Sequence, residues 1–274
     1  WDEVESALAI NNEPATPTLV SWPGLSTVSD LITIGAEPTT YSPYGAHWKG
    51  NPGALDLIKS RKIGVQDEGS QLVALVFAAA AGGESWLDMC AGPGGKAAML
   101  QAGISPSGGV LDCLEPIPNR ADLVRQALNP KLQANVMVGY GQDAKAGFYD
   151  AVLLDAPCSG LGSVRRKPES RWRKTTEQLS GLTKTQSELL VAAAKALKSG
   201  GYLLYSTCSP LVIETNTQIK QLLDTHLELE LVNANEVLNR ISPALGMSTT
   251  RKTAQLWTHL HATDAMFIAI LRKK

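Results

Sequence analysis

Two cysteines of this chain lie in similar polar turns, each just after an apolar run. Cys158 lies in the run DAPCSG at residues 155–160, and Cys208 lies in the run STCSP at residues 206–210. A lone cysteine is most often a small buried hydrophobe. A thiol in a polar turn is instead open to forming the thiolate that acts as a nucleophile. The matching positions of the two cysteines, with Asp155 ending the first apolar run, predict a functional site.

A glycine-rich turn lies at residues 87–96, with the sequence LDMCAGPGGK, between an apolar run and a helical one. It matches neither GxGxxG nor the GxxxxGK[ST] phosphate loop, so a dinucleotide or ATP is not indicated. Glycines allow a ligand to approach the backbone closely, and an acid such as Glu115, at the end of the next strand, commonly binds ribose hydroxyls. We therefore expect a nucleoside-bearing cofactor. The alternative is an ordinary strand–turn–helix junction with an incidental surface glutamate.

A basic cluster, RRKPESRWRK at residues 165–174, begins seven residues after Cys158 and holds six bases and one acid. A basic cluster with an aromatic residue beside an active site is typical of a surface that binds phosphates and stacks bases. The alternatives are a solvated loop and, for the tryptophan, ordinary packing under that loop. The predicted RNA-binding residues are Arg165, Arg166, Lys167, Arg171, Trp172 and Arg173.

Strand-like and helical segments alternate from about residue 63 onward, which predicts an α/β fold with a mostly parallel sheet and helices on both faces. Before that point, turn signals and short apolar runs indicate a small subdomain of strands and turns. We therefore divide the chain into residues 1–64 and residues 65–274. The expected strands are 85–90, 109–115, 135–140, 149–156, 202–207 and 266–271, and the expected helices are 68–81, 96 onward, 120–128 and 175–197.

Composition narrows the class of protein. The chain has 274 residues, a net charge of −1 and 44% hydrophobic residues, which argues against a disordered chain and against a protein coated in basic charge. No apolar run reaches the ~18–20 residues that cross a bilayer, and we see no signal peptide. The four cysteines show neither a disulfide framework nor zinc spacing, which favours a cytoplasmic protein. The chain begins with Trp1, so we expect a fragment.

With these motifs, the sequence resembles the RNA cytosine-C5 methyltransferases that use S-adenosylmethionine. The likeness extends from VQDEGSQ at residues 65–71 to LWTHLHATDAMF at residues 256–267. It is greatest to the bacterial enzymes that modify 16S ribosomal RNA, which often carry an N-terminal RNA-binding domain that this chain does not show. The resemblance implies a Rossmann-like, seven-stranded class I methyltransferase sheet with a small N-terminal α+β subdomain. It also implies S-adenosylhomocysteine as product, and an RNA partner, 16S rRNA or a small-subunit assembly intermediate.

The resemblance also implies roles for individual residues. Cys208 would be the nucleophile, Cys158 would help to release the product, and Asp155 and Lys96 would act beside the target base. Tyr140 stands where the family usually has an acid that reaches the adenine, and Asp143 is the candidate to replace it. The residues expected to hold the cofactor are Cys90, Ala91, Gly92, Pro93, Gly94, Gly95, Lys96, Glu115, Asp143 and Asp155.

Neighbouring families offer contrasts. DNA cytosine-C5 methyltransferases place their nucleophile in the Pro-Cys motif and lack a Thr-Cys partner, so Cys208 favours RNA. Amino-group methyltransferases carry an Asn/Asp-Pro-Pro-aromatic turn where this chain has DAPC. The open alternatives are the same reaction on tRNA or on another rRNA position, and a cofactor-binding RNA scaffold without activity. We expect a monomer without a metal ion and without contact with a membrane.

Overall fold

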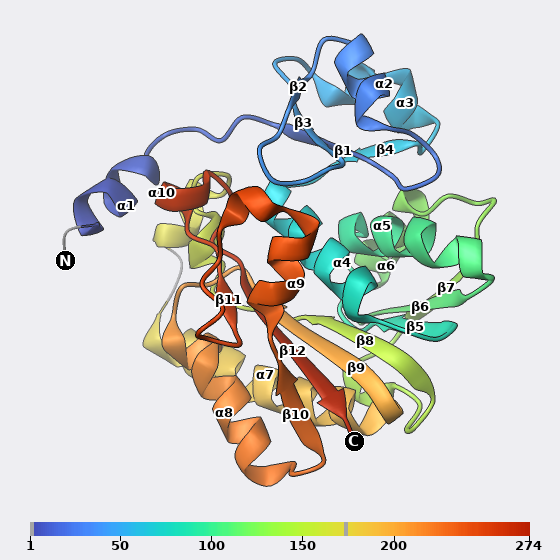
Figure 1. Ribbon diagram of the computed structural model, residues 1–274, viewed down its shortest axis with the longest axis vertical. Coiled ribbons are helices and arrows are strands. Elements are labelled where there is room, and N and C mark those ends of the chain that lie inside the picture. The colour runs from blue at the N-terminus through green and yellow to red at the C-terminus, as the bar shows by residue number, and fades with distance from the viewer. Residues whose placement is uncertain (1–2, 173–174) are drawn as a thin grey trace.

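The computed structural model describes residues 3–172 and 175–274 and contains two sheets (Figure 1). The smaller sheet has the strand order β2-β3-β1-β4, with antiparallel neighbours. Its apolar core is formed by Leu19, Leu31, Ala46 and Ile63 with their neighbours. The strands are β1 (Thr18–Ser21), β2 (Glu37–Pro38), β3 (Gly45–His47) and β4 (Ile63–Val65), and the short helices are α2 (Val28–Thr33) and α3 (Asp56–Lys59).

The first helix, α1 (Val4–Ile10), lies apart from this small sheet. It packs against α10 (Thr258–His261), although the two helices lie far apart in the sequence (Figure 1). The residues assigned to the N-terminal subdomain are therefore distributed over two places. The small sheet lies above the larger sheet in Figure 1, and the first helix lies beside α10.

The larger sheet has the strand order β10-β12-β9-β8-β5-β6-β7, and β11 pairs with β12 outside this path. The five strands from β9 to β7 run parallel, whereas β12 runs antiparallel to both of its neighbours. This is the expected mostly parallel sheet of seven strands in series. The strands are β5 (Ser85–Asp88), β6 (Val110–Glu115), β7 (Ala134–Val138), β8 (Tyr149–Asp155), β9 (Leu197–Thr207), β10 (Leu229–Val232), β11 (Ala254–Gln255) and β12 (Phe267–Lys273).

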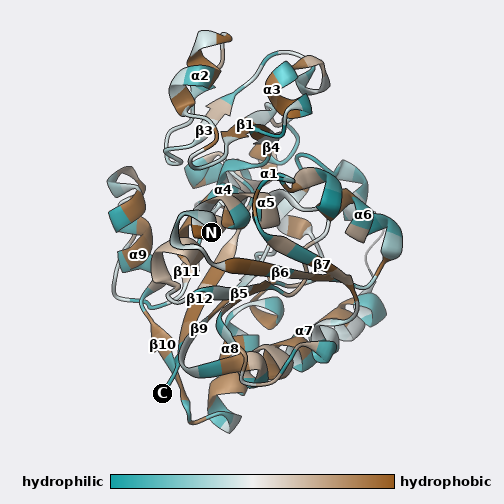
Figure 2. Ribbon diagram, turned by 90° about the vertical axis from the view of Figure 1, so that its right-hand side faces the viewer, coloured by the Kyte–Doolittle hydropathy of each residue, from teal (hydrophilic) through white to brown (hydrophobic). Residues whose placement is uncertain are grey.

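Helices cover both faces of this sheet (Figure 2). One face packs against α4, α5, α6 and α9, and the other packs against α7 and α8. The helices are α4 (Glu68–Ala80), α5 (Gly95–Ile104), α6 (Pro118–Ala127), α7 (Thr176–Ala196), α8 (Asn216–Thr225) and α9 (Ala234–Ile241). Local signals fix several ends: Thr175 forms a capping box with Gln178 at the start of α7, and the Asp67 carboxylate accepts the Gly69 N–H at the start of α4.

The expected strands and helices correspond to observed ones, with differences of a few residues at their ends. The sequence patterns did not indicate β10, β11, α8 or α9. In the described part of the chain, no helix combines the length and the apolar character needed to cross a membrane.

Candidate active site

The two motif cysteines meet at the carboxyl edge of the large sheet. Strands β8 and β9 are parallel neighbours, with Asp155 opposite Ser206, so the turns that follow them lie side by side. The Cys158 and Cys208 Sγ atoms are 3.4 Å apart, within hydrogen-bonding distance for thiols. Both cysteines are half-buried free thiols. The sequence prediction that they share one site therefore agrees with the geometry.

The surroundings distinguish the two thiols. The hydrogen bond with Cys158 lowers the pKa of Cys208, and the positive charge of Lys96 acts in the same direction against burial. The same hydrogen bond, together with burial, raises the pKa of Cys158. Of the two thiols, Cys208 is therefore the more acidic and Cys158 holds its proton more tightly. The lower pKa lies on Cys208, the cysteine for which the family resemblance implies the role of nucleophile.

A polar chain beside the thiols begins at Lys96, on the first turn of α5. The Lys96 Nζ atom donates to Asp155 Oδ2 at 2.7 Å and to Ser70 Oγ at 3.1 Å. The Ser206 hydroxyl donates to Asp155 Oδ1 at 2.6 Å. Burial acts to lower the pKa of Lys96, but the Asp155 carboxylate outweighs it, and the net shift is upward. Lys96 is therefore a positive charge among acidic groups at this edge of the sheet.

The glycine-rich turn forms a tight cradle between β5 and α5. A Cβ atom on Gly92 would lie 2.2 Å from Glu115 Oε2, so a larger residue there would displace the Glu115 carboxylate. Gly94 has φ +107°, a left-handed conformation that favours glycine. Glu115 is buried at the end of β6, where its carboxylate accepts the Ile117 N–H and pairs with Arg120. Glycine backbone and an acid thus converge where the sequence predicts the cofactor.

Asp88 is a residue of this site that the sequence analysis did not select. It ends β5, is 1% exposed, and neither carboxylate oxygen has a hydrogen-bond partner among the described residues. Burial and the nearby charge of Asp155 raise its pKa to about 7. A buried acid without a partner is costly, which is typical of a group that binds a ligand. The cradle, Glu115 and this unpartnered acid therefore fit a ligand with hydroxyl and ammonium donors, such as S-adenosylmethionine.

The two residues singled out near the adenine side are both exposed. Tyr140 is 66% exposed, with its backbone N–H bonded to the Asp143 carboxylate at 2.8 Å. Asp143 thus caps the short turn after β7. The remaining cysteines differ from the motif pair: Cys113 is fully buried, and burial raises the pKa of Cys90, so both are best described as ordinary protonated thiols.

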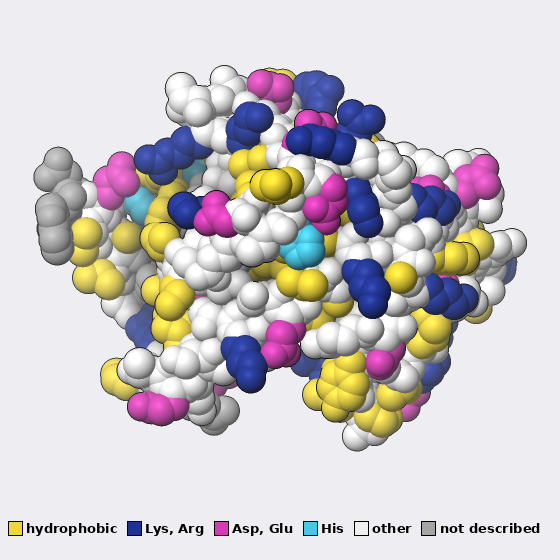
Figure 3. Space-filling model, turned by 90° about the horizontal axis from the view of Figure 1, so that it is seen from below, with side chains coloured by type: hydrophobic (Ala, Val, Ile, Leu, Met, Phe, Trp, Pro, Cys, Tyr) yellow, Lys and Arg dark blue, Asp and Glu magenta, His cyan; other side chains and the backbone are white. Residues whose placement is uncertain are grey.

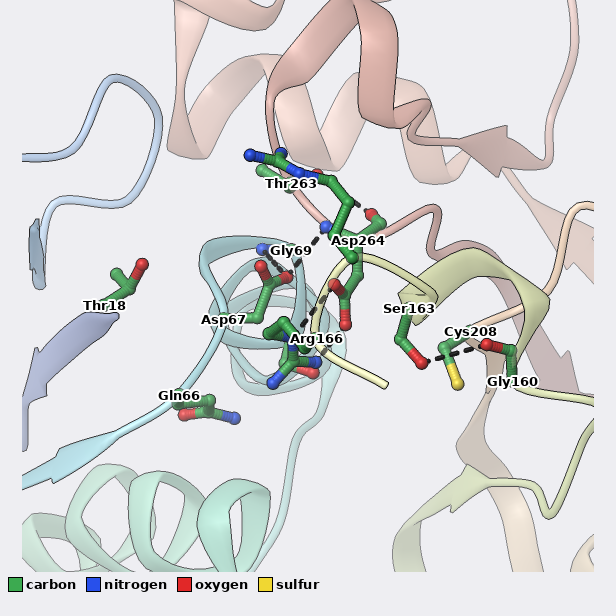
Figure 4. Close-up of polar contacts among 12 residues, drawn as sticks. Thr18, Gln66, Asp67, Gly69, Gly160, Ser163, Arg166, Cys208, Thr263 and Asp264 are labelled. Atoms are coloured by element: carbon green, nitrogen blue, oxygen red, sulfur yellow. Dashed lines mark hydrogen bonds and ion pairs between the residues drawn. The ribbon is translucent and has the colours of Figure 1, made fainter. Parts of the chain in front are cut away.

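An ion pair between a half-exposed arginine and a buried aspartate anchors the basic cluster beside Cys208. Arg166 pairs with Asp264 through both carboxylate oxygens, and the Asp264 N–H donates to Asp67 (Figure 4). Asp264 is 4% exposed. Burial and the charge of Asp264 raise the pKa of Asp67 to about 7. Arg166 therefore holds its loop against the segment before β12, while part of its side chain stays exposed to solvent.

Two other arginines of the basic cluster also bind the protein itself, whereas Lys167 and Trp172 are exposed. Arg165 donates to the carbonyl groups of Glu13 and Ala262, and Arg171 bonds to the Asn11 carbonyl and the Asn12 side chain, so both tie the segment after α1 to this loop. Lys167 is exposed, and Trp172 is 86% exposed, which excludes packing of its ring under the loop. Arg173 lies outside the described residues. Basic and acidic side chains are interspersed on the face seen in Figure 3, in keeping with the near-neutral charge.

Comparison with known proteins now identifies the family. The family model described as 16S rRNA methyltransferase RsmB/F matches residues 75–272. The chain belongs to this family. It is 39% identical over 99% of its length to a Mycobacterium tuberculosis protein named "putative methyltransferase", of which the match covers 60%. It is 34% identical over 77% of its length to the ribosomal RNA small subunit methyltransferase B of Vibrio cholerae, covering 46% of that protein.

The fold of this RsmB/F family member agrees with a solved structure. A methyltransferase homolog from Pyrococcus horikoshii superimposes with a TM-score of 0.78 at 21% identity, covering 100% of this chain and 91% of the other. Family and fold together make S-adenosylmethionine the cofactor. The chain spans only 60% of the Mycobacterium relative and 46% of the Vibrio relative.

Proposed function

We propose that this RsmB/F family member methylates C5 of a cytosine in RNA, with 16S rRNA as the substrate. The observation that carries the proposal is the 3.4 Å separation of the Cys158 and Cys208 sulfurs beside the Lys96–Asp155 pair. Neither one thiol nor a cofactor cradle alone would distinguish this reaction from other methyl transfers. Two thiols with opposite pKa shifts fit a reaction that needs both an attacking thiolate and a protonated partner.

The reaction begins with nucleophilic addition to the pyrimidine ring. Cytosine C5 is a weak nucleophile, and addition of the Cys208 thiolate to C6 interrupts the aromatic ring and makes C5 electron-rich. The bound S-adenosylmethionine supplies the electrophilic methyl group. Asp155 lies where it can bind the edge of the base, and Lys96 holds that carboxylate and supports protonation at N3.

Product release reverses the addition. The C5 proton leaves to a base, the electron pair of that C–H bond restores the C5–C6 double bond, and the bond between C6 and sulfur breaks. The proton taken up at N3 is returned at the same stage to the side of the site that holds Asp155. Cys208 leaves as a thiolate. Cys158 lies close enough to act at this step, because its sulfur already contacts the departing sulfur. We therefore assign Cys158 to release and Cys208 to attack.

Cofactor binding falls to the cradle at the carboxyl ends of β5 and β6. Residues Cys90–Lys96 line the methionine and ribose side, and Glu115 binds the ribose hydroxyls. The buried Asp88 carboxylate supports the assignment, because both of its oxygens can still accept hydrogen bonds from a ligand. On the adenine side, Asp143 takes the place of the acid that Tyr140 replaces.

RNA binding is proposed at the exposed part of the basic cluster. Trp172 offers a stacking surface for an extruded or single-stranded base, and Lys167 offers a charge for flanking phosphates. Arg165, Arg166 and Arg171 shape this loop through their contacts with the segment after α1 and with the segment before β12. We further propose that the small N-terminal sheet contributes to RNA binding and that a monomer acts on 16S rRNA or a small-subunit assembly intermediate.

A methylation assay with chemical mapping tests this proposal. Purified protein, labelled S-adenosylmethionine and either 16S rRNA or small subunits lacking the modification are incubated, and 5-methylcytosine is mapped by bisulfite sequencing. We expect one cytosine of 16S rRNA to acquire the methyl group. Transfer to tRNA in place of 16S rRNA would change the substrate, and transfer to any atom other than cytosine C5 would refute the reaction.

A further inference from the structure

A fully buried carboxylate, that of Glu214, connects the two turns that carry the cysteines. Glu214 lies in a short 3₁₀ turn, Val212–Glu214, and is 0% exposed. Its Oε1 atom accepts the Ser159 N–H at 2.7 Å and the Gln186 amide at 3.1 Å. Its Oε2 atom accepts the hydroxyls of Ser159 at 2.6 Å and Ser209 at 2.5 Å. Each carboxylate oxygen therefore accepts two hydrogen bonds.

Two of these partners are the residues that directly follow the motif cysteines in the sequence. Ser159 directly follows Cys158, and Ser209 directly follows Cys208. One carboxylate thus holds the residue after each motif cysteine. Gln186, from α7, also donates to the Pro157 carbonyl at 2.9 Å, so the same side chain fixes the residue before Cys158. The motif turns are joined through Glu214 although they lie 50 residues apart in the chain.

The turn that carries Glu214 is itself held firmly. The buried Tyr205 hydroxyl donates to the Glu214 carbonyl at 2.7 Å, and the Glu214 N–H donates to the Leu211 carbonyl at 3.0 Å. The backbone and side chain of Glu214 are therefore both fixed to β9 and to the segment after it. A buried carboxylate is costly to desolvate, and its retention is favoured where it satisfies several donors that would otherwise be unpaired.

We propose that Glu214 is a positioning residue that sets the distance between the two thiols. It touches neither sulfur. It binds the backbone N–H of Ser159 after Cys158 and the side-chain hydroxyl of Ser209 after Cys208, and these bonds hold the two turns at the spacing that gives the 3.4 Å contact between the sulfurs. Loss of the contact raises the pKa of Cys208, because the hydrogen bond from Cys158 is the main stabilisation of its thiolate. The effect on catalysis rests on the proposed cytosine-C5 reaction, whereas the effect on the thiols does not.

A disulfide-formation assay measures the thiol separation directly. Diamide, a diazene, oxidises two neighbouring thiols to a disulfide and is itself reduced to the hydrazine, taking up two electrons and two protons. The rate of the Cys158–Cys208 crosslink is followed by peptide mass spectrometry in the full chain. We expect Glu214→Ala to slow this crosslink at least about tenfold. Glu214→Gln, which keeps one acceptor oxygen, should fall between Ala and wild type.

Two further variants keep the test decisive. Ser209→Ala removes the link from Glu214 to the Cys208 turn while leaving Ser159 and Gln186 in place, so it should slow the crosslink even if Glu214→Ala fails to fold. Asp112→Asn is the matched control, because that carboxylate accepts hydrogen bonds from Tyr149 and Asn135 near the opposite end of β6. It should crosslink at the wild-type rate. Wild-type rates in folded Ser209→Ala and Glu214→Ala proteins would overturn the proposal.

Catalytic measurements then separate this proposal from the proposed function. In an active enzyme, Glu214→Gln should lower kcat about tenfold or more with an unchanged KM for RNA, and should move the pH dependence of Cys208 alkylation upward. If the wild-type protein methylates no RNA while the crosslink still depends on Glu214, only the proposed function fails. If methylation occurs and depends on Cys208, but the crosslinking rate and kcat are the same in wild type and in the Glu214 variants, only the positioning role fails.

Discussion

Replacing Asp88 by Asn should make the protein more stable and, at the same time, a poorer binder of its cofactor. Asp88 is 1% exposed, and its carboxylate oxygens have no partner among the described residues. Its pKa rises from 3.8 to about 7 because of burial and the charge of Asp155. Asn has nearly the same shape and carries no charge. The variant therefore removes an electrostatic cost that the folded protein bears without ligand.

The size of the effect follows from the pKa shift. An acid whose pKa is raised in the folded state binds more protons there than in the unfolded state, so stability falls as pH rises from about 4 to about 7 and then levels off. The pKa of Asp88 rises from 3.8 to about 7. At about 1.4 kcal/mol for each pKa unit, this rise lowers the free energy of unfolding by about 4 kcal/mol at pH values above 7. Of this loss in the free energy of unfolding, about 2.5 kcal/mol occurs between pH 5 and pH 8.

Urea unfolding of wild type and Asp88→Asn at pH 5 and at pH 8, at equal ionic strength, checks this. The gain in the free energy of unfolding should be about 2.5 kcal/mol larger at pH 8 than at pH 5. Asp67, whose pKa is also raised to about 7, titrates in both proteins and cancels in the difference. Asp112→Asn, which removes a hydrogen-bonded carboxylate, should show no such gain. Equal gains at both pH values, or a less stable variant at pH 8, would refute the reasoning.

Three further outcomes follow from the site. Lys96→Met should raise the pKa of Cys208 and reduce methylation at least about tenfold, since the ammonium group helps to hold the thiolate; the pH dependence of Cys208 alkylation measures the shift. Lys167→Ala combined with Trp172→Ala should weaken RNA binding and, through the lysine, flatten its salt dependence, measured by filter binding at several ionic strengths. Arg166→Ala should instead lower the free energy of unfolding by about 2 kcal/mol, because it leaves the buried Asp264 carboxylate without its partner. The loss is limited because the Arg166 side chain is half-exposed, so solvent already screens the pair.

The sequence was most informative where chemistry follows strand order. Parallel strands place their carboxyl ends along one edge, so motifs after consecutive strands must meet there. This is why Cys158, Cys208 and the glycine-rich turn could be assigned to one site from spacing alone. The same reasoning accounts for Asp155, which ends β8 at that edge, whereas the role of Lys96 was expected from the resemblance to the family.

What the sequence could not show depends on contacts between distant segments. The partner of Arg166 is Asp264, 98 residues away, and nothing in the basic cluster indicates that its arginines bind the protein itself. Asp88 looked like any strand-terminal acid, because its lack of partners is a property of packing. Glu214 likewise gave no signal, since its donors come from three separate elements.

The central claim is that Cys208 attacks the base and Cys158 releases it, and the fate of the RNA in two single variants tests it most directly. Cys158→Ala and Cys208→Ala proteins are incubated with substrate RNA and S-adenosylmethionine and analysed by denaturing gel electrophoresis. We predict that Cys158→Ala accumulates a covalent protein–RNA adduct, whereas Cys208→Ala forms neither adduct nor product. Full methylation by Cys208→Ala, or an adduct that persists without Cys208, would contradict the account.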